Sequence, residues 1–247
     1  MLGPGEPAPF EVVNPRGRAP VLLVCDHASA RLPAALGDLG LAGADLTRHI
    51  AWDIGAADAT RRLASLFDAP AILCGYSRLV VDCNRRLDDA TLMPAVSDGS
   101  AVPGNRTLDA SGREARLAAI YRPYHEAIAR RLDQWRPGTE PVVLSIHSCT
   151  PVMGGVERPW HIGVCWDEDL RIAGPVMDAL RRRGDVHVGD NQPYALDRRE
   201  DYTVPVHAME RGLRHLQVEF RQDLIDEAPK AHHWADILAD ALRAVLV

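Results

Sequence analysis

The class of fold is decided by the stretch PVLLVCDHAS at residues 20–29. Its first half is a short, continuous apolar run, which is typical of a β-strand buried on both faces. Its second half begins with a carboxylate and an imidazole, Asp26 and His27. In α/β proteins, functional groups collect where the strands end at the carboxyl edge of the sheet. We therefore interpret residues 20–25 as a central strand that carries Asp26 and His27 to a site.

The same pattern recurs along the chain and predicts an alternation of strands and helices. Such an alternation indicates an α/β protein with a largely parallel or mixed sheet. We expect residues 1–247 to form a single domain, because neither a repeat nor a long linker divides them. The expected strands are 71–74, 79–83, 141–146, 162–165 and 216–220; the expected helices are 46–67, 112–135, 170–183 and one within 223–247 that begins near Ala228; the expected surface loop or lid is 93–105.

Composition restricts the class of function. The chain has 28 Lys+Arg against 34 Asp+Glu, a net charge of −6, and 47% hydrophobic residues. These values exclude a disordered chain and argue against a general nucleic-acid binder, which needs a basic face. An apolar run of about 18 residues and a signal peptide are both missing from the sequence, so we expect a cytoplasmic protein without membrane contact. The five cysteines form no CxxC pair and are expected to be buried and reduced.

Two histidines follow separate apolar runs and are candidate ligands of one divalent metal. His27 follows the first run and His147 follows residues 141–146. A carboxylate would complete such a set. His49 and Asp53 are four residues apart, which places them on one face of the helix expected there, and Asp26 is also available. Motifs of dinucleotide binding, of P-loop phosphate binding and of the serine-hydrolase elbow are missing from the sequence.

A second group of polar residues lies in the stretch SRLVVDCNRR at residues 77–86. Arg78 precedes the expected strand 79–83, and Asn84 and Arg85 follow it. A guanidinium fork and an amide N–H that leave a strand together can hold a carboxylate. This stretch therefore indicates a site for an acidic ligand.

These motifs together resemble a known family. The stretches DHAS (26–29), SRLVVDCNR (77–85), SIHS (145–148) and VEFRQDL (218–224) are similar to those of the N-formylglutamate amidohydrolase family, over about residues 20–240. The family is similar in fold to zinc carboxypeptidases and aspartoacylases. The resemblance implies a zinc-exopeptidase-like, three-layer α/β/α sandwich with a central mixed, mostly parallel sheet. It also implies one divalent metal, zinc by preference, and a function in histidine catabolism.

The resemblance also assigns roles to single residues. It implies that His27 and His147 are metal ligands, that Glu219 is the general base and that Arg78 polarises the scissile carbonyl. Carboxypeptidases have His-x-x-Glu at the first ligand, but Ala30 occupies the glutamate position here. We expect the third ligand to be Asp53, since Trp-Asp there resembles the family's Trp-His. The alternatives are Asp26 and His49, and the implied substrate-binding residues are Asn84, Arg85 and Ser148.

These roles predict a metal-dependent amidohydrolase that removes an acyl group from a small N-acylated, carboxylate-bearing amino acid. The leading substrate is N-formyl-L-glutamate. Two alternatives remain at this point. One is a peptidase or amidase that acts on a larger peptide, and the other is a metal-free binding protein for acidic metabolites.

Overall fold

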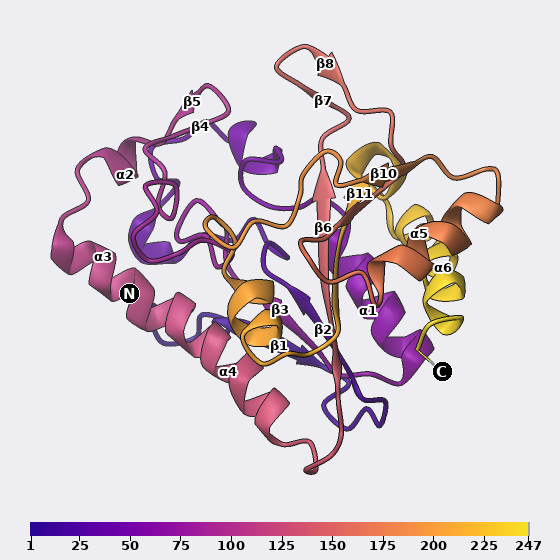
Figure 1. The fold of residues 1–247 in the computed structure, drawn as a ribbon. Helices are drawn as coiled ribbons and strands as arrows, with labels where there is room; N and C mark the ends of the chain where they lie inside the picture. The colour runs from indigo at the N-terminus through magenta and orange to yellow at the C-terminus, as the bar shows by residue number, and fades with distance from the viewer. Residues whose placement is uncertain (247) are drawn as a thin grey trace.

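A computed structural model describes residues 1–246 and shows a central sheet of seven strands. Val247, the last residue of the expected segment 223–247, lies outside the described residues. The strand order is β1-β3-β2-β6-β11-β9-β10 (Figure 1). The strands are β1 (Phe10–Val13), β2 (Val21–Cys25), β3 (Ala71–Cys74), β6 (Val142–Cys149), β9 (Ile162–Cys165), β10 (Val188–Asp190) and β11 (His215–Arg221).

The sheet is mixed and mostly parallel, as predicted. β2 pairs in parallel with β3 and β6, β6 with β11, and β9 with β10. Only the pairs β1–β3 and β9–β11 of this sheet are antiparallel. All residues of β2, β3, β6 and β9 are buried. Continuous burial of this kind explains the unbroken apolar runs, because helices cover both faces of a parallel sheet.

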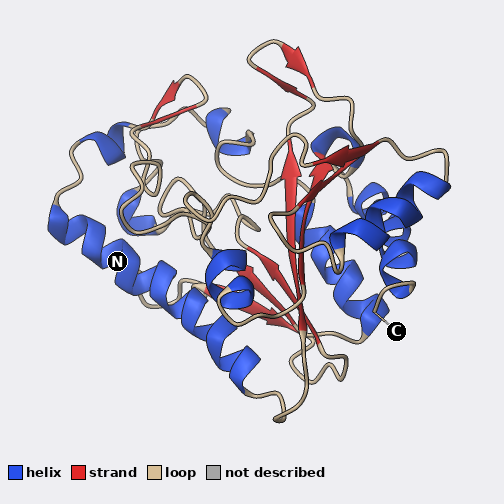
Figure 2. Ribbon diagram, in the orientation of Figure 1, coloured by secondary structure: helices blue, strands red, loops and turns tan. Residues whose placement is uncertain are grey.

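Helices form a layer on each face of the sheet and complete the three-layer α/β/α sandwich (Figures 1 and 2). One layer contains α1 (Ala56–Phe67), α5 (Ala173–Arg182) and α6 (Ala228–Arg243). The other contains α3 (Ala110–Arg116), a π-helical segment (Leu117–Tyr121) and α4 (Arg122–Asp133), which together form the helix expected at 112–135.

Two hydrophobic cores lie between these layers. Leu23 of β2 packs into the core on the α1, α5 and α6 side, whereas Leu22 and Val24 face the other core. Successive side chains of a strand point to opposite faces, so one apolar strand contributes to both cores. The five cysteines are all buried and free, as expected. Among residues 1–246, none of the helices is both long enough and apolar enough to cross a bilayer.

The expected strand 79–83 is wrong. These residues are buried but lie in turns rather than in the sheet. Side chains satisfy their backbone in place of a neighbouring strand: the amide of Asn105 donates to the Leu79 carbonyl (2.9 Å), and Arg116 donates to the Val80 carbonyl (2.9 Å). The apolar pattern therefore reports burial here, but not β-structure.

The expected helix 46–67 is correct only from Ala56 onward. The preceding segment is irregular, so His49 and Asp53 do not share a helix face. Gly55 precedes α1 with φ +78°, and a Cβ atom there would lie 1.9 Å from the carbonyl oxygen of Ile225. Only glycine fits this contact, which fixes the entry to α1 against the segment after β11.

The remaining elements surround the carboxyl edge of the sheet. The segment 93–105, expected as a loop, contains a hairpin of β4 (Val96–Ser97) and β5 (Ser100–Ala101) and the short helix α2 (Pro103–Arg106). A second hairpin follows β6 and consists of β7 (Val152–Met153) and β8 (Val156–Glu157). The sequence did not predict β1, β10 or either hairpin. A π-helical turn (Pro205–Met209) and short 3-10 turns (Ala34–Leu36, Asp45–Thr47 and Gln222–Leu224) complete the fold.

Candidate active site

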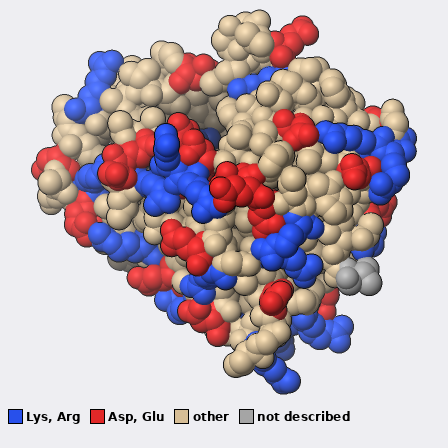
Figure 3. Space-filling model, viewed as in Figure 1, with Lys and Arg blue, Asp and Glu red and all other residues tan. Residues whose placement is uncertain are grey.

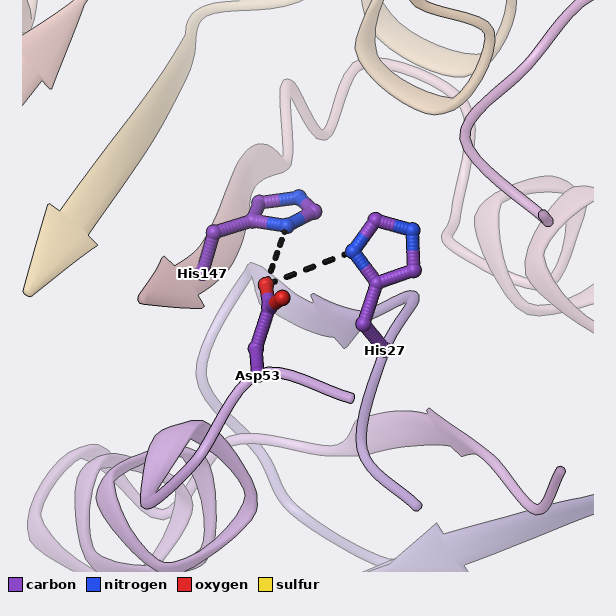
Figure 4. A group of neighbouring side chains, drawn as sticks. All are labelled: His27, Asp53 and His147. Carbon is purple, nitrogen blue, oxygen red and sulfur yellow. Dashed lines mark hydrogen bonds and ion pairs between the residues drawn. The ribbon is translucent and has the colours of Figure 1, made fainter. Parts of the chain in front are cut away.

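His27, Asp53 and His147 meet near the carboxyl edge of the sheet (Figure 4). Asp53 Oδ2 lies 2.9 Å from His147 Nδ1 and 3.3 Å from His27 Nδ1. His27 follows β2, His147 lies within β6, and Asp53 precedes α1, so three segments far apart in sequence converge. The backbone N–H of Asp53 donates to the His27 carbonyl (2.9 Å), which ties the irregular segment to the end of β2.

The other ring nitrogen of each histidine faces a second carboxylate. His27 Nε2 lies 2.7 Å from Asp82 Oδ1, and His147 Nε2 lies 3.2 Å from Asp26 Oδ2. Asp26 is held in turn by the hydroxyls of Tyr124 (2.9 Å) and Thr203 (2.6 Å), which donate to its Oδ1. Both imidazole rings are therefore fixed, with Nδ1 directed at Asp53.

This arrangement fits a divalent metal. One ligand atom from each of His27, Asp53 and His147 lies within 4.8 Å of the others, and all three residues are buried. Imidazole nitrogens and a carboxylate oxygen are a usual donor set for zinc, with a further position left for water or substrate. Histidines that bind a metal usually donate the second ring N–H to a carboxylate or carbonyl, as Asp82 allows for His27. Nε2 of His147 is within hydrogen-bond distance of the Ser145 hydroxyl (3.0 Å), with Asp26 close by.

The other two candidates for the third ligand lie elsewhere. Asp26 faces Nε2 of His147, on the side of the ring away from Asp53. His49 Nε2 lies 3.3 Å from Asp98 Oδ2, a residue of the turn between β4 and β5. The structure thus places Asp53, rather than Asp26 or His49, between Nδ1 of His27 and Nδ1 of His147.

The carboxylates favour the charged form of both histidines. Burial and the charge of Arg78 oppose protonation of His27, but Asp82 and Asp53 outweigh them and raise its pKa. Burial likewise opposes protonation of His147, and its contacts with Asp26 and Asp53 raise its pKa well above the usual value. The metal-free protein therefore favours the imidazolium form of both side chains, and a metal that binds must displace a proton from each histidine that is charged.

Glu219 lies beside His147, because the two residues are register partners in the parallel pair β6–β11. Its side chain is buried, and Oε2 has no hydrogen-bond partner within residues 1–246. Burial and the charge of Asp53 raise its pKa to about 7, although the nearby His147 opposes this shift. A carboxyl group with a pKa near neutrality can both accept and donate a proton at physiological pH.

Arg78 lies next to the same group of residues. It donates two hydrogen bonds to Asp82 Oδ2 (2.7 and 3.0 Å), and its Nη1 lies 3.5 Å from Asp53 Oδ1. These carboxylates outweigh the effect of burial and raise the pKa of Arg78, so it is always charged. Asp82 therefore fixes two groups of the site at once, Arg78 and His27.

Asn84 and Arg85 differ in what remains available to a ligand. The Asn84 amide donates to Asp201 Oδ1 (2.9 Å), and its oxygen accepts the backbone N–H groups of Tyr202 (3.1 Å) and Thr203 (3.0 Å). Arg85 is half-buried; it donates to Thr91 and to the Asn84 carbonyl, and lies 3.6 Å from Asp201. The Asn84 side chain thus holds the neighbouring segment, whereas Arg85 keeps a guanidinium in the cavity.

Ser148 is also tied to its surroundings. Its hydroxyl donates to the Ile54 carbonyl (2.8 Å), and its backbone N–H donates to Asp53 Oδ2 (3.3 Å). The amide of Gln222 donates to the Ser148 carbonyl at 3.2 Å. These contacts hold Asp53 in place, and a direct role of Ser148 in substrate binding stays a prediction.

All predicted site residues line one cavity of about 620 Å³. The surface is hollowed between the two hairpins, near the top of the view in Figure 3. Its lining includes residues to which the sequence had assigned no role. Two of them carried a signal, because Asp82 lies inside the SRLVVDCNRR stretch and Gln222 inside the VEFRQDL stretch. Arg158, Tyr194 and Gln217 are among those that carried none.

The three-layer fold and this cavity define an α/β/α protein with a group of buried side chains that could hold a metal ion. Comparison with known proteins adds the family. The chain belongs to the N-formylglutamate amidohydrolase family, whose model matches residues 19–226. This confirms the resemblance seen in the sequence motifs.

Individual relatives agree with this family. An N-formylglutamate deformylase of Pseudomonas putida is 33% identical over 132 residues, which is 49% of this chain and 48% of that protein. The match thus spans about half the length of this curated relative. A gene product of Agrobacterium tumefaciens of known crystal structure is 34% identical, with a TM-score of 0.95 over 99% of this chain and 97% of that one. An N-formylglutamate amidohydrolase from Ralstonia eutropha JMP134 shares the fold at 18% identity, with a TM-score of 0.72 over 96% and 97% of the two chains.

Proposed function

We propose that this protein hydrolyses the amide bond of an N-acylated amino acid that carries a carboxylate, with N-formyl-L-glutamate as the leading substrate. The observation that carries the proposal is the position of Glu219: a buried carboxylate, unpaired at Oε2, beside the group of His27, Asp53 and His147. Family membership supports the same reaction, because the family is named for it.

The metal site and Glu219 divide the chemistry between them. His27, Asp53 and His147 would hold a divalent metal, zinc by preference, which when bound would lower the pKa of a water to about 7 and polarise the carbonyl of the amide. Glu219 accepts the proton of the attacking water and donates it to the leaving nitrogen as the C–N bond breaks.

Arg78 supplies positive charge where the carbonyl oxygen becomes an oxyanion. It is held by Asp82, it is always charged, and it lines the cavity close to Asp53. A fixed donor of this kind loses no energy to reorganisation during the reaction, and one such contact often contributes about 3 kcal/mol.

Arg85 binds the carboxylate of the substrate. A planar guanidinium fork matches a carboxylate through two N–H bonds, which fixes the orientation of the ligand as well as its position. Asn84 supports this subsite by holding residues 201–203, and Ser148 supports Asp53.

Turnover by the purified protein tests the proposal. We expect the zinc-loaded chain to release formate and glutamate from N-formyl-L-glutamate, and the same preparation treated with EDTA to lose this activity. The loss should be reversed by added zinc. Unchanged turnover after complete metal removal would contradict the metal-dependent reaction, and no turnover by the zinc-loaded chain would contradict the substrate.

A further inference from the structure

Arg158 is a third arginine of the cavity, and neither the sequence motifs nor the proposed reaction uses it. It follows β8 and its backbone is anchored: the N–H of Arg158 donates to the Pro151 carbonyl (2.8 Å), and its own carbonyl accepts from Arg221 (3.4 Å). Its guanidinium stacks over the ring of Tyr194 at 4.8 Å and donates to the Tyr194 hydroxyl (2.8 Å). The head group is therefore positioned rather than free in solvent.

The charge of Arg158 is not neutralised by a neighbouring acid, unlike the charges of the other two arginines of the site. Arg78 is paired with Asp82, and Arg85 lies 3.6 Å from Asp201. Within residues 1–246, Arg158 has no carboxylate within ion-pair distance, and its Nη1 is buried without a hydrogen-bond partner. A buried donor of this kind is costly unless a ligand satisfies it.

The partner that suits this position is a carboxylate. Nη1 of Arg158 offers an unused N–H group at the wall of the cavity, and the hydroxyl of Tyr194 lies next to the guanidinium. An arginine stacked on an aromatic ring binds anions well, because its fork is held in place before the ligand arrives.

We propose that Arg158, held in place by Tyr194, is a specificity-determining residue that forms a second carboxylate subsite in the cavity. The inference deepens the proposed function, because it assumes that Arg85 binds the other carboxylate. A dicarboxylate can bind both guanidinium groups, whereas a ligand whose single carboxylate binds Arg85 leaves Nη1 of Arg158 without a partner. A ligand that leaves a buried polar group of the site unpaired is strongly rejected.

Binding of the amino-acid product and its two monoamides tests this subsite without turnover. Dissociation constants would be measured by calorimetry for L-glutamate, L-glutamine and the α-amide isoglutamine, on the zinc-loaded wild type and on Arg158→Gln and Arg85→Gln. Each variant should bind L-glutamate roughly 10- to 100-fold more weakly, the effect of one charge-assisted hydrogen-bond pair. The loss of affinity caused by Arg158→Gln should vanish for one of the two monoamides. The loss caused by Arg85→Gln should vanish for the other monoamide.

A matched control is Arg181→Gln, since Arg181 is exposed, pairs with Asp190 and does not line the cavity. This variant should bind all three ligands as the wild type does. Arg158→Lys, which keeps the charge but not the fork, should recover only part of the lost affinity for L-glutamate.

The outcomes separate this inference from the proposed function. The second subsite would be overturned if Arg158→Gln bound all three ligands as the wild type does, or if it lost the same affinity for all three. It would also be overturned if the losses caused by Arg158→Gln and Arg85→Gln vanished for the same monoamide. Weak binding of L-glutamate by the wild type, no tighter than that of both monoamides, would overturn it as well. If the two variants lose their effect on different monoamides but the protein does not hydrolyse N-formyl-L-glutamate, the subsite is retained and the proposed reaction is rejected.

Discussion

Glu219 and His147 are register partners on two adjacent parallel strands, β11 and β6. The pairing places a general-base candidate beside a metal-ligand candidate through the rigid sheet rather than through a loop. Sites built on strands hold their side chains more accurately than sites built on loops. The relationship between the proposed base and the proposed metal site is therefore a property of the fold.

Replacing Glu219 by Gln should abolish turnover while the metal stays bound. Glutamine keeps the shape of the side chain but cannot accept the proton, so kcat should fall by at least roughly 10²- to 10⁴-fold. Steady-state kinetics and metal analysis on the same preparation measure both effects. A variant with activity within about tenfold of the wild type would remove Glu219 from the mechanism.

Replacing Asp82 by Asn should weaken metal binding although Asp82 is not a proposed ligand. Asp82 fixes His27 through Nε2 and Arg78 through two N–H bonds. Loss of such a supporting carboxylate typically reduces metal affinity by about 10- to 100-fold. Competition with a chromophoric chelator measures the zinc affinity, and an unchanged affinity would show that Asp82 does not support His27.

The metal-free protein should lose stability as the pH rises through neutrality. The pKa of Glu219 is raised from 4.5 to about 7, so its contribution is complete below 4.5 and is lost as the pH rises through about 7. The pKa values of His27 and His147 are raised above 6.5, and their contribution is lost only at still higher pH. Up to about pH 6.5 the buried His125 and His207 act in the opposite direction, because burial lowers their pKa values to about 3 and about 4. Thermal unfolding in EDTA should therefore give a Tm that falls from about pH 6.5 upward.

Two comparisons check the origin of this pH dependence. The Tm of Glu219→Gln should rise relative to that of the wild type as the pH increases from about 5 to 7, because the carboxyl group that loses its proton in this range is gone. Zinc should reverse the trend, since it competes with protons for both histidines and binds more tightly at higher pH. A Tm of the metal-free wild type that is constant or rises from about pH 6.5 to 8 would contradict the protonation states inferred for the site.

Arg85→Lys should be costly only for substrates that carry the carboxylate bound there. Lysine retains a point charge but not the fork, and the lost contact corresponds to about 2–4 kcal/mol, or roughly 30- to 1000-fold in kcat/KM. The neutral amide of that carboxylate never makes the contact, so its kcat/KM should be unaffected. An equal penalty on the acid and on the amide would assign Arg85 a structural role instead.

Much of the fold was predictable because burial on both faces of a sheet leaves a direct signal in the sequence. The run at residues 21–25 is a strand from end to end, and His27 lies just beyond it as expected. The resemblance of the VEFRQDL stretch (218–224) to the family also indicated Glu219. The structure places that residue among the predicted metal ligands.

Other features depend on tertiary contacts that no local pattern records. The apolar residues 79–83 read as a strand, but their carbonyl groups are bound by Asn105 and Arg116 from distant segments. The four-residue spacing of His49 and Asp53 suggested a shared helix face, yet the helix begins only after Gly55. Arg158 follows a hairpin that the sequence did not predict, so its place in the cavity was not foreseen.

The central claim, that His27, Asp53 and His147 hold one metal beside Glu219, is tested most directly by anomalous diffraction. Crystals soaked in zinc would be measured at the zinc absorption edge. We expect one strong anomalous peak bounded by His27 Nδ1, Asp53 Oδ2 and His147 Nδ1. A soaked crystal that lacks a peak at this position, or whose only strong peak lies at other side chains, would contradict the account.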